Sequence, residues 1–284
     1  MGGRGAVASR AVAVDGACQP RAVPLLREGH GEGSALSGLK RVLVFAGLDP
    51  SGRAGLLADG QAISANGAQP VLCATAVAAQ SARRLVRMEP VSPAALMAQA
   101  EGALEDGPVA AVKIGMVGSR ALLQVLVGLL QGPLAGTPAV ADPVLSTSSG
   151  GALFEAEPSE WLPLAWAARL VTPNLLEAGA LTGLPCRDES EMETAARALA
   201  ALGVRASLIK GGHLPGVPAD LLWDAGQVHR YRGQRIARQS RGTGCRLASG
   251  IAARLAKGEG LEASVEGAIA YLKEWMKGPE VREA

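Results

Sequence analysis

The strongest constraint on the fold is an alternation of short apolar runs with segments of helical periodicity, which extends from residue 40 to residue 277. Runs this short are typical of strands rather than of buried helices. They stand at 42–46, 71–77, 110–114, 138–141, 169–171 and 207–209. Strands this apolar are buried on both faces, so the pattern predicts a mostly parallel sheet with helices packed on both sides.

Six helices are expected around these strands. One of them opens with a capping-box pair, Asp188 and Glu191, followed by apolar residues at helical spacing. The expected helices cover 54–66, 92–104, 119–130, 188–202, 243–256 and 261–277. Two further apolar segments, 221–223 and 228–231, flank a short turn with a glycine at position 226, which predicts a small β-hairpin.

Residues 1–39 differ from the rest of the chain. They are rich in glycine, contain scattered arginines, and show neither a sustained periodicity nor the apolar core of a secretory signal. This composition predicts a disordered N-terminal extension. Because no repeat or linker interrupts 40–278, we expect residues 40–284 to form a single domain.

Composition excludes several classes of function. The chain has 28 Lys and Arg against 26 Asp and Glu, a net charge of +2, and no basic stripe for a nucleic acid. No stretch approaches the roughly 18 apolar residues of a membrane span. The four cysteines follow no zinc or CxxC spacing, and the three histidines are scattered. We therefore expect a cytoplasmic protein with reduced thiols and no nucleic-acid or membrane partner.

The sharpest candidate for chemistry is Gly242-Thr243-Gly244-Cys245, which opens an apolar helix. Glycines at a helix start let backbone N–H groups approach an anion, and the helix dipole favours a phosphate there. A helix N-terminus also lowers the pKa of a cysteine thiol, so Cys245 could act as a general base. The alternative is an ordinary glycine-rich loop with an inert, buried cysteine.

A second small-residue loop, 49–55, lies directly between the first strand and the first helix. Small residues allow a ligand to lie against the backbone at this point. The alternative is a simple strand-to-helix turn in which Asp49 or Ser51 caps the helix.

Polar residues follow several other strands. Asn174 and Glu177 share one face of a helical turn and could hold a hydrated Mg²⁺, or Asn174 could merely cap the helix. Lys210 ends a strand and could neutralise a phosphate, or it could be solvated beside its glycine turn. Gln80 could pair a donor and an acceptor with a flat heterocycle.

Several nucleotide-binding and hydrolase motifs do not occur. The chain has no G-x-x-x-x-G-K-[ST] sequence, no G-x-G-x-x-G after the first strand and no G-x-S-x-G nucleophile elbow. A P-loop NTPase, a dinucleotide-binding Rossmann domain and an α/β-hydrolase are therefore not expected.

Taken together, the strand-end motifs resemble one family, the hydroxymethylpyrimidine / hydroxymethylpyrimidine-phosphate kinases of thiamine biosynthesis, in the ribokinase-like superfamily. The resemblance covers about residues 41–277 and rests on eight segments in register. These segments are AGLDPSGRAGLLAD, ATAVAAQS, KIGM, DPVLSTSSG, VTPNLLEA, LIKGGH, DLLWD and GTGC.

The resemblance implies a three-layer αβα sandwich with a mostly parallel central sheet, a small hairpin and no large lid domain. It implies ATP-dependent phosphorylation of 4-amino-5-hydroxymethyl-2-methylpyrimidine and of its monophosphate, with Mg²⁺ as cofactor, in a homo-oligomer expected to be a dimer. The implied substrate contacts are Gly47, Asp49, Asp59, Gln80 and Met116. The implied catalytic residues are Cys245 as the base and Gly242, Thr243 and Gly244 as the anion hole. Lys210, Asn174 and Thr243 would contact ATP, and Asn174 and Glu177 would hold Mg²⁺ through water.

Three arginines depart from the family pattern. Arg53 stands where the family usually has a glycine, Arg241 where it has a histidine, and Arg246 where it has a small or hydroxyl residue. These side chains could strengthen binding of a phosphorylated substrate, or they could fill the pocket. Two alternatives to a pyrimidine kinase therefore stay open: a pyridoxine-type kinase of the same fold, and a non-catalytic pyrimidine-binding homologue.

Overall fold

A computed structural model describes residues 38–80, 85–145, 153–154, 156–212, 214, 216–233 and 241–278. The extension expected at residues 1–39 therefore lies outside the described residues up to residue 37. The end of the DPVLSTSSG segment also lies outside them.

The described residues form a nine-stranded sheet in the order β3-β2-β1-β4-β5-β6-β7-β8-β9. Its core is parallel, from β2 through β1, β4, β5 and β6 to β7. Antiparallel strands complete both edges, β3 on one side and the hairpin β8–β9 on the other. The strands are β1 (Arg41–Leu48), β2 (Gln69–Gln80), β3 (Leu85–Pro90), β4 (Ala111–Ile114), β5 (Ala139–Ala141), β6 (Leu170–Val171), β7 (Ala206–Ile209), β8 (Ala219–Asp224) and β9 (Gln227–Arg232).

The predicted parallel sheet and hairpin are confirmed, with two differences at one edge. Strand β2 runs to Gln80, past its apolar stretch, because its far end pairs with β3. Strand β3 itself was not predicted, since its sequence LVRMEP mixes apolar and charged residues on an exposed edge.

The helices stand close to where the sequence places them, and the structure adds two short ones. Helix α4 was not predicted because six residues are too few to show a periodicity, and α5 extends to eight residues the single helical turn expected at Asn174 and Glu177. The helices are α1 (Gly55–Ala65), α2 (Pro93–Glu105), α3 (Arg120–Gln131), α4 (Leu162–Ala167) after a 3₁₀ turn (Pro158–Trp161), α5 (Leu175–Thr182), α6 (Glu189–Ala201), α7 (Thr243–Ala256) and α8 (Leu261–Lys277).

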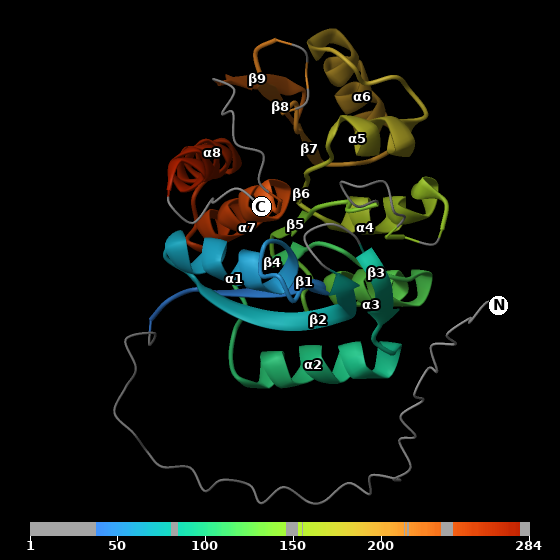
Figure 1. The fold of residues 1–284 in the computed structure, drawn as a ribbon, viewed down its shortest axis with the longest axis vertical. Coiled ribbons are helices and arrows are strands. Elements are labelled where there is room, and N and C mark those ends of the chain that lie inside the picture. The colour runs from blue at the N-terminus through green and yellow to red at the C-terminus, as the bar shows by residue number, and fades with distance from the viewer. Residues whose placement is uncertain are drawn as a thin grey trace, which may run out of the picture. The chain divides into compact units, whose positions relative to one another are not determined.

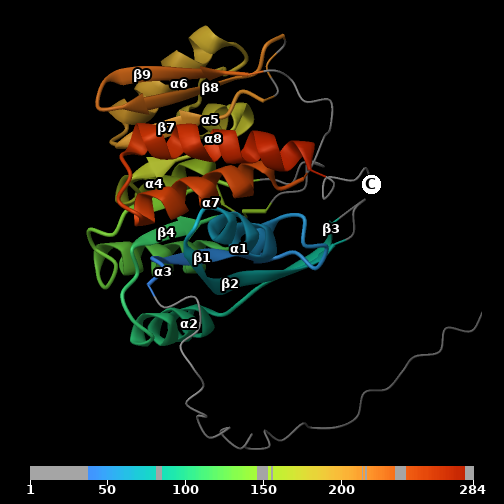
Figure 2. The ribbon, with the colours of Figure 1, turned by 90° about the vertical axis from the view of Figure 1, so that its left-hand side faces the viewer.

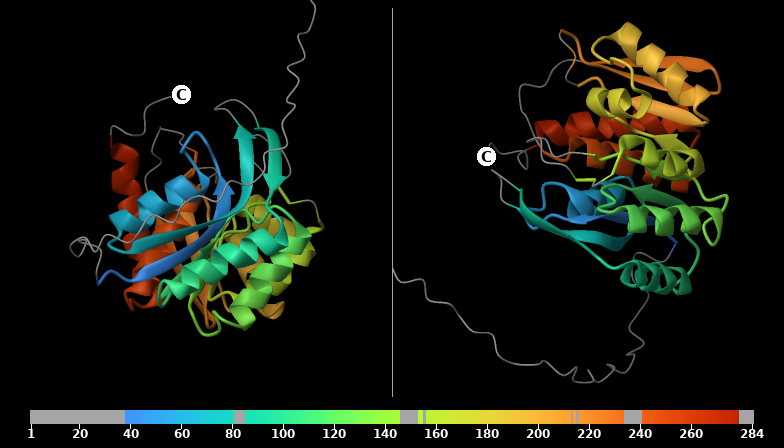
Figure 3. Two further views of the ribbon diagram at one scale, coloured as in Figure 1. Left: turned by 90° about the horizontal axis from the view of Figure 1, so that it is seen from below. Right: turned by 90° about the vertical axis from the view of Figure 1, so that its right-hand side faces the viewer.

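Helices cover both faces of the sheet, as Figure 1 shows. Helices α1, α7 and α8 lie on one face, in front of the sheet in Figure 2, over a core that includes Val44, Val140 and Ile251. Helices α2, α3 and α4 lie on the opposite face, seen in the right panel of Figure 3, over a core that includes Phe45 and Leu126. The architecture is therefore the expected three-layer αβα sandwich.

Side chains define where several helices begin. Ser92 Oγ accepts a hydrogen bond from the Ala95 N–H at the start of α2. At the start of α6, Asp188 accepts from the Glu191 N–H, but the Glu191 carboxylate accepts from the backbone N–H and the guanidinium of Arg187 and not from the Asp188 N–H. The capping box expected there is therefore only half formed, because an exposed arginine competes for its glutamate.

One side chain also caps an edge of the sheet. Gln99 on α2 accepts a hydrogen bond from the Ala74 N–H at 2.8 Å and donates one to the Ala74 carbonyl at 3.0 Å. A single amide thus makes both hydrogen bonds that a neighbouring strand would make to Ala74.

Two loops meet at the carboxyl edge of the sheet with no room for side chains between them. Within the first of them, Gly55 has φ +60°, and a Cβ on it would lie 2.1 Å from the carbonyl oxygen of Gly47 at the end of β1, so the turn from β1 into α1 is itself tightly closed. Gly242 has φ +80°, and a Cβ there would lie 2.0 Å from the carbonyl oxygen of Arg53. The 49–55 loop and the loop before α7 therefore touch through their backbones.

The close approach of Gly55 to the Gly47 carbonyl predicts that substitution of the two glycines at the ends of α1 destabilises the protein to different extents. Gly55→Ala should destabilise the protein by about 3 kcal/mol or more, because backbone strain and a steric clash add. Gly67→Ala is the matched control: Gly67 also has positive φ, +77°, but a Cβ there would meet nothing within 4 Å. It should cost only about 1–2 kcal/mol.

Urea unfolding of the two variants measures the difference. Equal losses would show that the turn from β1 into α1 relaxes around the added methyl group.

Candidate active site

Polar side chains converge where β5, β6 and β7 end. Lys210 Nζ lies 2.6 Å from Asp142 Oδ1, and Thr172 Oγ1 donates to the same oxygen at 3.0 Å. Each of these residues directly follows its strand, so the topology alone places them together. Burial opposes the charge of Lys210, but Asp142 and Glu177 outweigh it and raise the pKa of the ammonium.

The first turn of α7 lies against this group. A Cβ on Gly244 would lie 3.1 Å from Lys210 Nζ and 3.8 Å from Asp142 Oδ2. The glycine therefore lets the helix N-terminus, with its exposed N–H groups and positive dipole end, approach the lysine. A lysine and a helix N-terminus at one point make a setting for an anion, as the GTGC motif predicts.

Asn174 and Glu177 open α5 beside Lys210. Asn174 Oδ1 accepts from the Glu177 N–H at 2.9 Å, and Glu177 Oε2 accepts from the Asn174 N–H at 2.8 Å. The capping interpretation of this pair is therefore confirmed. Burial raises the pKa of Glu177 to about 7, Lys210 lowers it and Asp142 raises it further. Two carboxylates around one lysine favour an additional cation.

Asp49 organises the 49–55 loop. Its carboxylate accepts from the N–H and the hydroxyl of Ser51 at 2.9 and 2.8 Å and from the Ala54 N–H at 3.2 Å. Burial opposes this charge, but these bonds and one from the Gln80 amide outweigh it and lower the pKa of Asp49. The structure thus brings Asp49 and Gln80 together. One further amide N–H and the carbonyl of Gln80 can still pair with a ligand.

Gly47 and Met116 also meet. A Cβ on Gly47 would lie 2.1 Å from the Met116 Cε methyl group, so a larger residue there would push the end of this flexible side chain out of its position over the backbone. The Met116 carbonyl is fixed by the Thr75 hydroxyl at 2.6 Å. An apolar methyl group over bare backbone offers a flat surface to a planar ligand.

Cys245 differs from the expectation in its acidity. Burial raises the pKa of its thiol to about 11, although Lys113 and a hydrogen bond from the Gly55 N–H favour the thiolate. The prediction that the helix N-terminus lowers this pKa is wrong, because desolvation of the thiolate outweighs the helix dipole. Its position at the start of α7, beside the 49–55 loop, is as expected.

Asp59 has protein partners on both oxygens. Lys113 Nζ lies 2.7 Å from Oδ2, and Ser249 Oγ donates to Oδ1 at 2.8 Å. All three side chains are fully buried. The structure therefore does not place Asp59 on an exposed surface beside the other expected substrate contacts. It places Asp59 in a layer beneath them.

Sequence reasoning missed Lys113, Ser249 and Thr172 as members of this region. Lys113 stands inside the apolar strand β4, where a single lysine between Val112 and Ile114 was an available signal. An isolated cation in a strand with no exposed residue requires a buried partner.

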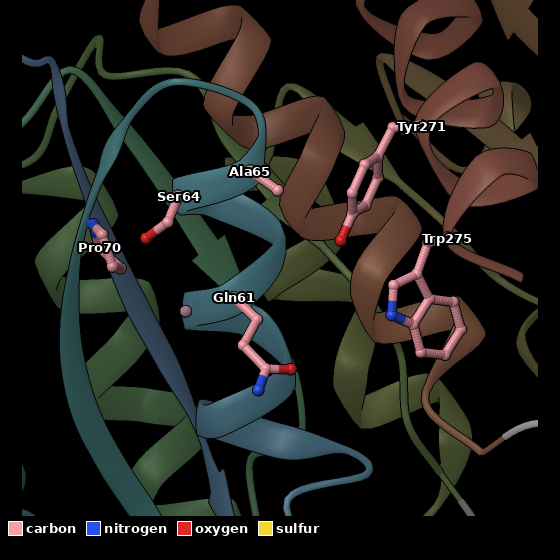
Figure 4. Close-up of a pocket in the computed structure, with 7 residues that line it drawn as sticks. Gln61, Ser64, Ala65, Pro70, Tyr271 and Trp275 are labelled. Atoms are coloured by element: carbon pink, nitrogen blue, oxygen red, sulfur yellow. The ribbon is translucent and has the colours of Figure 1, made fainter. Parts of the chain in front are cut away.

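Arg246 points away from the phosphate-handling residues. Its guanidinium lies 4.2 Å from the centre of the Trp275 ring and donates to Gln61 Oε1 at 2.8 Å. Figure 4 shows Gln61 on α1 and Trp275 on α8 on either side of a groove of about 480 Å³. Arg246 therefore neither fills the site nor adds to its anion binding. Of the other two arginines, Arg53 lies in the 49–55 loop and Arg241 lies directly before the GTGC motif, so both stand in loops at the site.

The edge built by these loops and strand ends is suited to a transferring phosphoryl group. Together with the αβα sandwich it defines a ribokinase-like kinase of small molecules. Among the described residues, no helix combines the length and apolar character needed to cross a membrane.

Comparison with known proteins identifies the family. The family model described as "Phosphomethylpyrimidine kinase" matches residues 49–282, and the chain belongs to this family. A hydroxymethylpyrimidine/phosphomethylpyrimidine kinase of Streptomyces coelicolor is 40% identical over 237 residues, which cover 81% of this chain and 86% of the relative.

Two solved structures extend the comparison. The phosphomethylpyrimidine kinase of Clostridium difficile superposes with a TM-score of 0.73 at 31% identity, covering 84% of this chain and 99% of that one. The pyridoxal kinase of Staphylococcus aureus in complex with AMP-PCP and pyridoxal has a TM-score of 0.74 at 28% identity, covering 83% and 87%.

The orientation of Arg246 predicts a structural rather than a catalytic role. Arg246→Ala should lower the free energy of unfolding by about 1–3 kcal/mol, through the lost packing, hydrogen bond and ring contact. Because the side chain faces Trp275, kcat should change less than about threefold. Thermal melts and steady-state kinetics measure the two effects.

Arg197→Ala is the matched control. Its guanidinium also lies over a ring, 4.7 Å from the centre of Trp223, but its side chain is 59% exposed. It should cost under about 1 kcal/mol. A large loss of kcat in Arg246→Ala at unchanged stability would contradict the assigned orientation.

Proposed function

We propose that this chain transfers the γ-phosphoryl group of ATP to the hydroxyl of 4-amino-5-hydroxymethyl-2-methylpyrimidine and then to the resulting monophosphate, in thiamine biosynthesis. The observation that carries the proposal is the meeting of Lys210, Asp142 and the α7 N-terminus at the carboxyl edge of the sheet. Membership of the phosphomethylpyrimidine kinase family supports the choice of substrate.

The pyrimidine would lie between the two backbone loops. Met116 over Gly47 offers a flat apolar surface, and Gln80 offers a donor and an acceptor to the aminopyrimidine edge. Asp49 holds the Gln80 amide in one orientation. Asp59 lies one layer deeper, so we assign it the positioning of Lys113 rather than a direct contact.

The phosphate groups would occupy the opposite side of the same edge. The N–H groups of Gly242, Thr243 and Gly244 would receive the transferring phosphoryl group, and Lys210 would neutralise its charge. Thr243 and Asn174 would also contact the nucleotide. The binding of AMP-PCP by the related S. aureus pyridoxal kinase supports ATP as the donor.

Mg²⁺ is the cofactor that such a transfer needs. The residues fit a hydrated ion: the capping bonds occupy one oxygen each of Asn174 and Glu177, and further lone pairs remain for water. Asn174 and Glu177 would hold the ion through these waters. When bound, Mg²⁺ offsets phosphate charge.

In the first transfer the hydroxymethyl oxygen bonds to the γ-phosphorus while the bond to the β-phosphate oxygen breaks. The hydroxyl proton passes to the Cys245 thiolate, and ADP leaves. In the second transfer the nucleophile is a phosphate oxygen. That oxygen is already anionic near neutral pH, because the second pKa of a phosphate monoester is about 6. Only the first transfer therefore needs a base.

The test of the function is ADP release in the presence of Mg²⁺ and ATP, with the pyrimidine alcohol, its monophosphate and pyridoxine offered separately. We expect turnover with both pyrimidines and little with pyridoxine. A preference for pyridoxine would favour the pyridoxine-type kinase. Binding of a pyrimidine without turnover by the folded protein would favour the non-catalytic homologue.

The role of Cys245 predicts an unequal effect on the two transfers. Cys245→Ala should lower kcat for the pyrimidine alcohol by about 10²–10⁴, the range for a lost general base. Turnover of the monophosphate should fall by less than about tenfold, since its nucleophile carries no proton to remove. Cys186→Ala, a buried cysteine in the α5–α6 region, is the control and should affect neither transfer. Equal losses on both substrates would remove Cys245 as the base.

We also propose a homodimer and a cytoplasmic location. The family resemblance implies the homodimer. The cytoplasmic location rests on the composition, and the three cysteines recorded among the described residues are all free thiols, which suits a reducing compartment. Light scattering of the purified chain tests the first.

A further inference from the structure

Two helices approach the site side by side and are linked at two levels one turn apart. At the upper level the Gly55 N–H of α1 bonds to the Cys245 sulfur of α7. At the lower level Ser249 of α7 donates to Asp59 of α1 at 2.8 Å. Both steps are four residues, so each pair lies on one face of its helix. The lower level therefore lies about 5–6 Å below the thiol.

A buried cation belongs to the lower level. Lys113 reaches up from β4 along the sheet, and a Cβ on Gly115 would lie 2.6 Å from its Nζ. The ammonium lies 2.7 Å from Asp59 Oδ2, and neither side chain has any exposed surface. Burial raises the pKa of Asp59, and the ammonium and the hydroxyl that donate to its two oxygens act against this rise and favour the carboxylate.

We propose that Lys113 is a positioning residue for Cys245: Asp59 and Ser249 hold its ammonium beneath the first turn of α7, where it stabilises the Cys245 thiolate. A buried ion pair is costly to assemble and is weak evidence for stability. Because this ion pair lies directly under the thiol, its ammonium group can stabilise the negative charge of the thiolate. The inference rests on the proposed role of Cys245 as the base.

Several other charged or hydrogen-bonding groups face Cys245, and their effects on the thiolate differ from that of Lys113. Asp59 from α1 and Asp142 after β5 disfavour the thiolate, and the Gly55 N–H favours it. Lys210, paired with Asp142 at 2.6 Å as Lys113 is paired with Asp59 at 2.7 Å, also interacts with the thiol from the end of β7. On α7 itself, Arg246 faces Trp275. Lys113 has a larger effect on the thiol than Asp59 or Asp142, and it acts against the burial that raises the pKa of Cys245 to about 11.

The test is the rate at which iodoacetamide alkylates Cys245 in the native protein, with the labelled cysteine identified by peptide mass spectrometry. Only the thiolate reacts, so the rate between about pH 7.5 and 9.5 reports the ionisation of the thiol. In Lys113→Met we expect the rate to fall about threefold to tenfold at each pH. A shift of about one pKa unit lowers the rate about threefold, and a shift of about two units lowers it about tenfold, once the higher nucleophilicity of the more basic thiolate is included.

The double variant Lys113→Met with Asp59→Asn keeps the test valid if the single variant does not fold, because it leaves no orphaned buried charge. We expect a slower alkylation rate there too, with a smaller change than in Lys113→Met. Ser249→Ala disturbs the same packing without removing a charge and should change the rate less than about twofold.

A purely structural role gives the opposite sign. Looser packing exposes the thiol and speeds alkylation, so a rate in Lys113→Met at or above that of the wild type overturns the inference. A loss in Ser249→Ala as large as that in Lys113→Met also overturns it. Alkylation needs no kinase substrate, so its result is independent of the result of the kinase assay. Slower alkylation with unchanged phosphorylation of the alcohol would support Lys113 and exclude Cys245 as the base.

Discussion

The site depends on a close backbone contact between the 49–55 loop and the loop that opens α7. At Gly242 a single methyl group would overlap the carbonyl oxygen of Arg53 in the facing loop, and at Gly55 it would overlap the carbonyl oxygen of Gly47 within the turn from β1 into α1. Because nothing separates the loops, α7 begins at the carboxyl edge of the sheet, and its first N–H groups reach the region of Lys210. Residues nearly 200 positions apart in the sequence thereby form one surface. The Gly55 N–H that bonds to Cys245 is part of the same contact.

Beneath that surface the charges alternate across the sheet. Asp59 pairs with Lys113, and Asp142 pairs with Lys210, which in turn faces Glu177. Such an array holds two cations in a buried region without a net surplus of positive charge. A phosphoryl group that arrives at the α7 N-terminus meets fixed cations instead of water, which is the condition under which electrostatic stabilisation is strongest.

The sequence predicts the parts of this arrangement that follow from topology. Apolar runs define the parallel sheet, and the carboxyl ends of parallel strands share one edge, so the order of the strands is enough to group Lys210, Asn174 and the GTGC motif. The pairing of Lys113 with Asp59 is not predictable in this way, because it joins residues 54 positions apart and no local spacing encodes it.

The other two differences also have physical causes. The pKa of Cys245 depends on burial, which a motif does not show. Arg246 is next to Cys245 in the sequence, but each helical residue rotates the side chain by about 100°, which turns the arginine toward α8. Two neighbouring residues of a helix therefore point in different directions, and the position of Arg246 next to Cys245 does not place its side chain at the site. The short helix α4 was missed, and only the first turn of α5 was expected, because such short helices show no clear period.

The amide of Gln99 has a consequence beyond the packing of α2. Open strand edges are templates on which chains join into larger sheets, and proteins block them with charges, prolines or covering elements. Here one side chain occupies both hydrogen-bonding groups of Ala74 on β2, and Pro70 near the start of that strand has no N–H to offer. Along the part of β2 that β3 does not pair, a glutamine and a proline thus remove backbone hydrogen-bonding groups that a strand of another molecule could otherwise use.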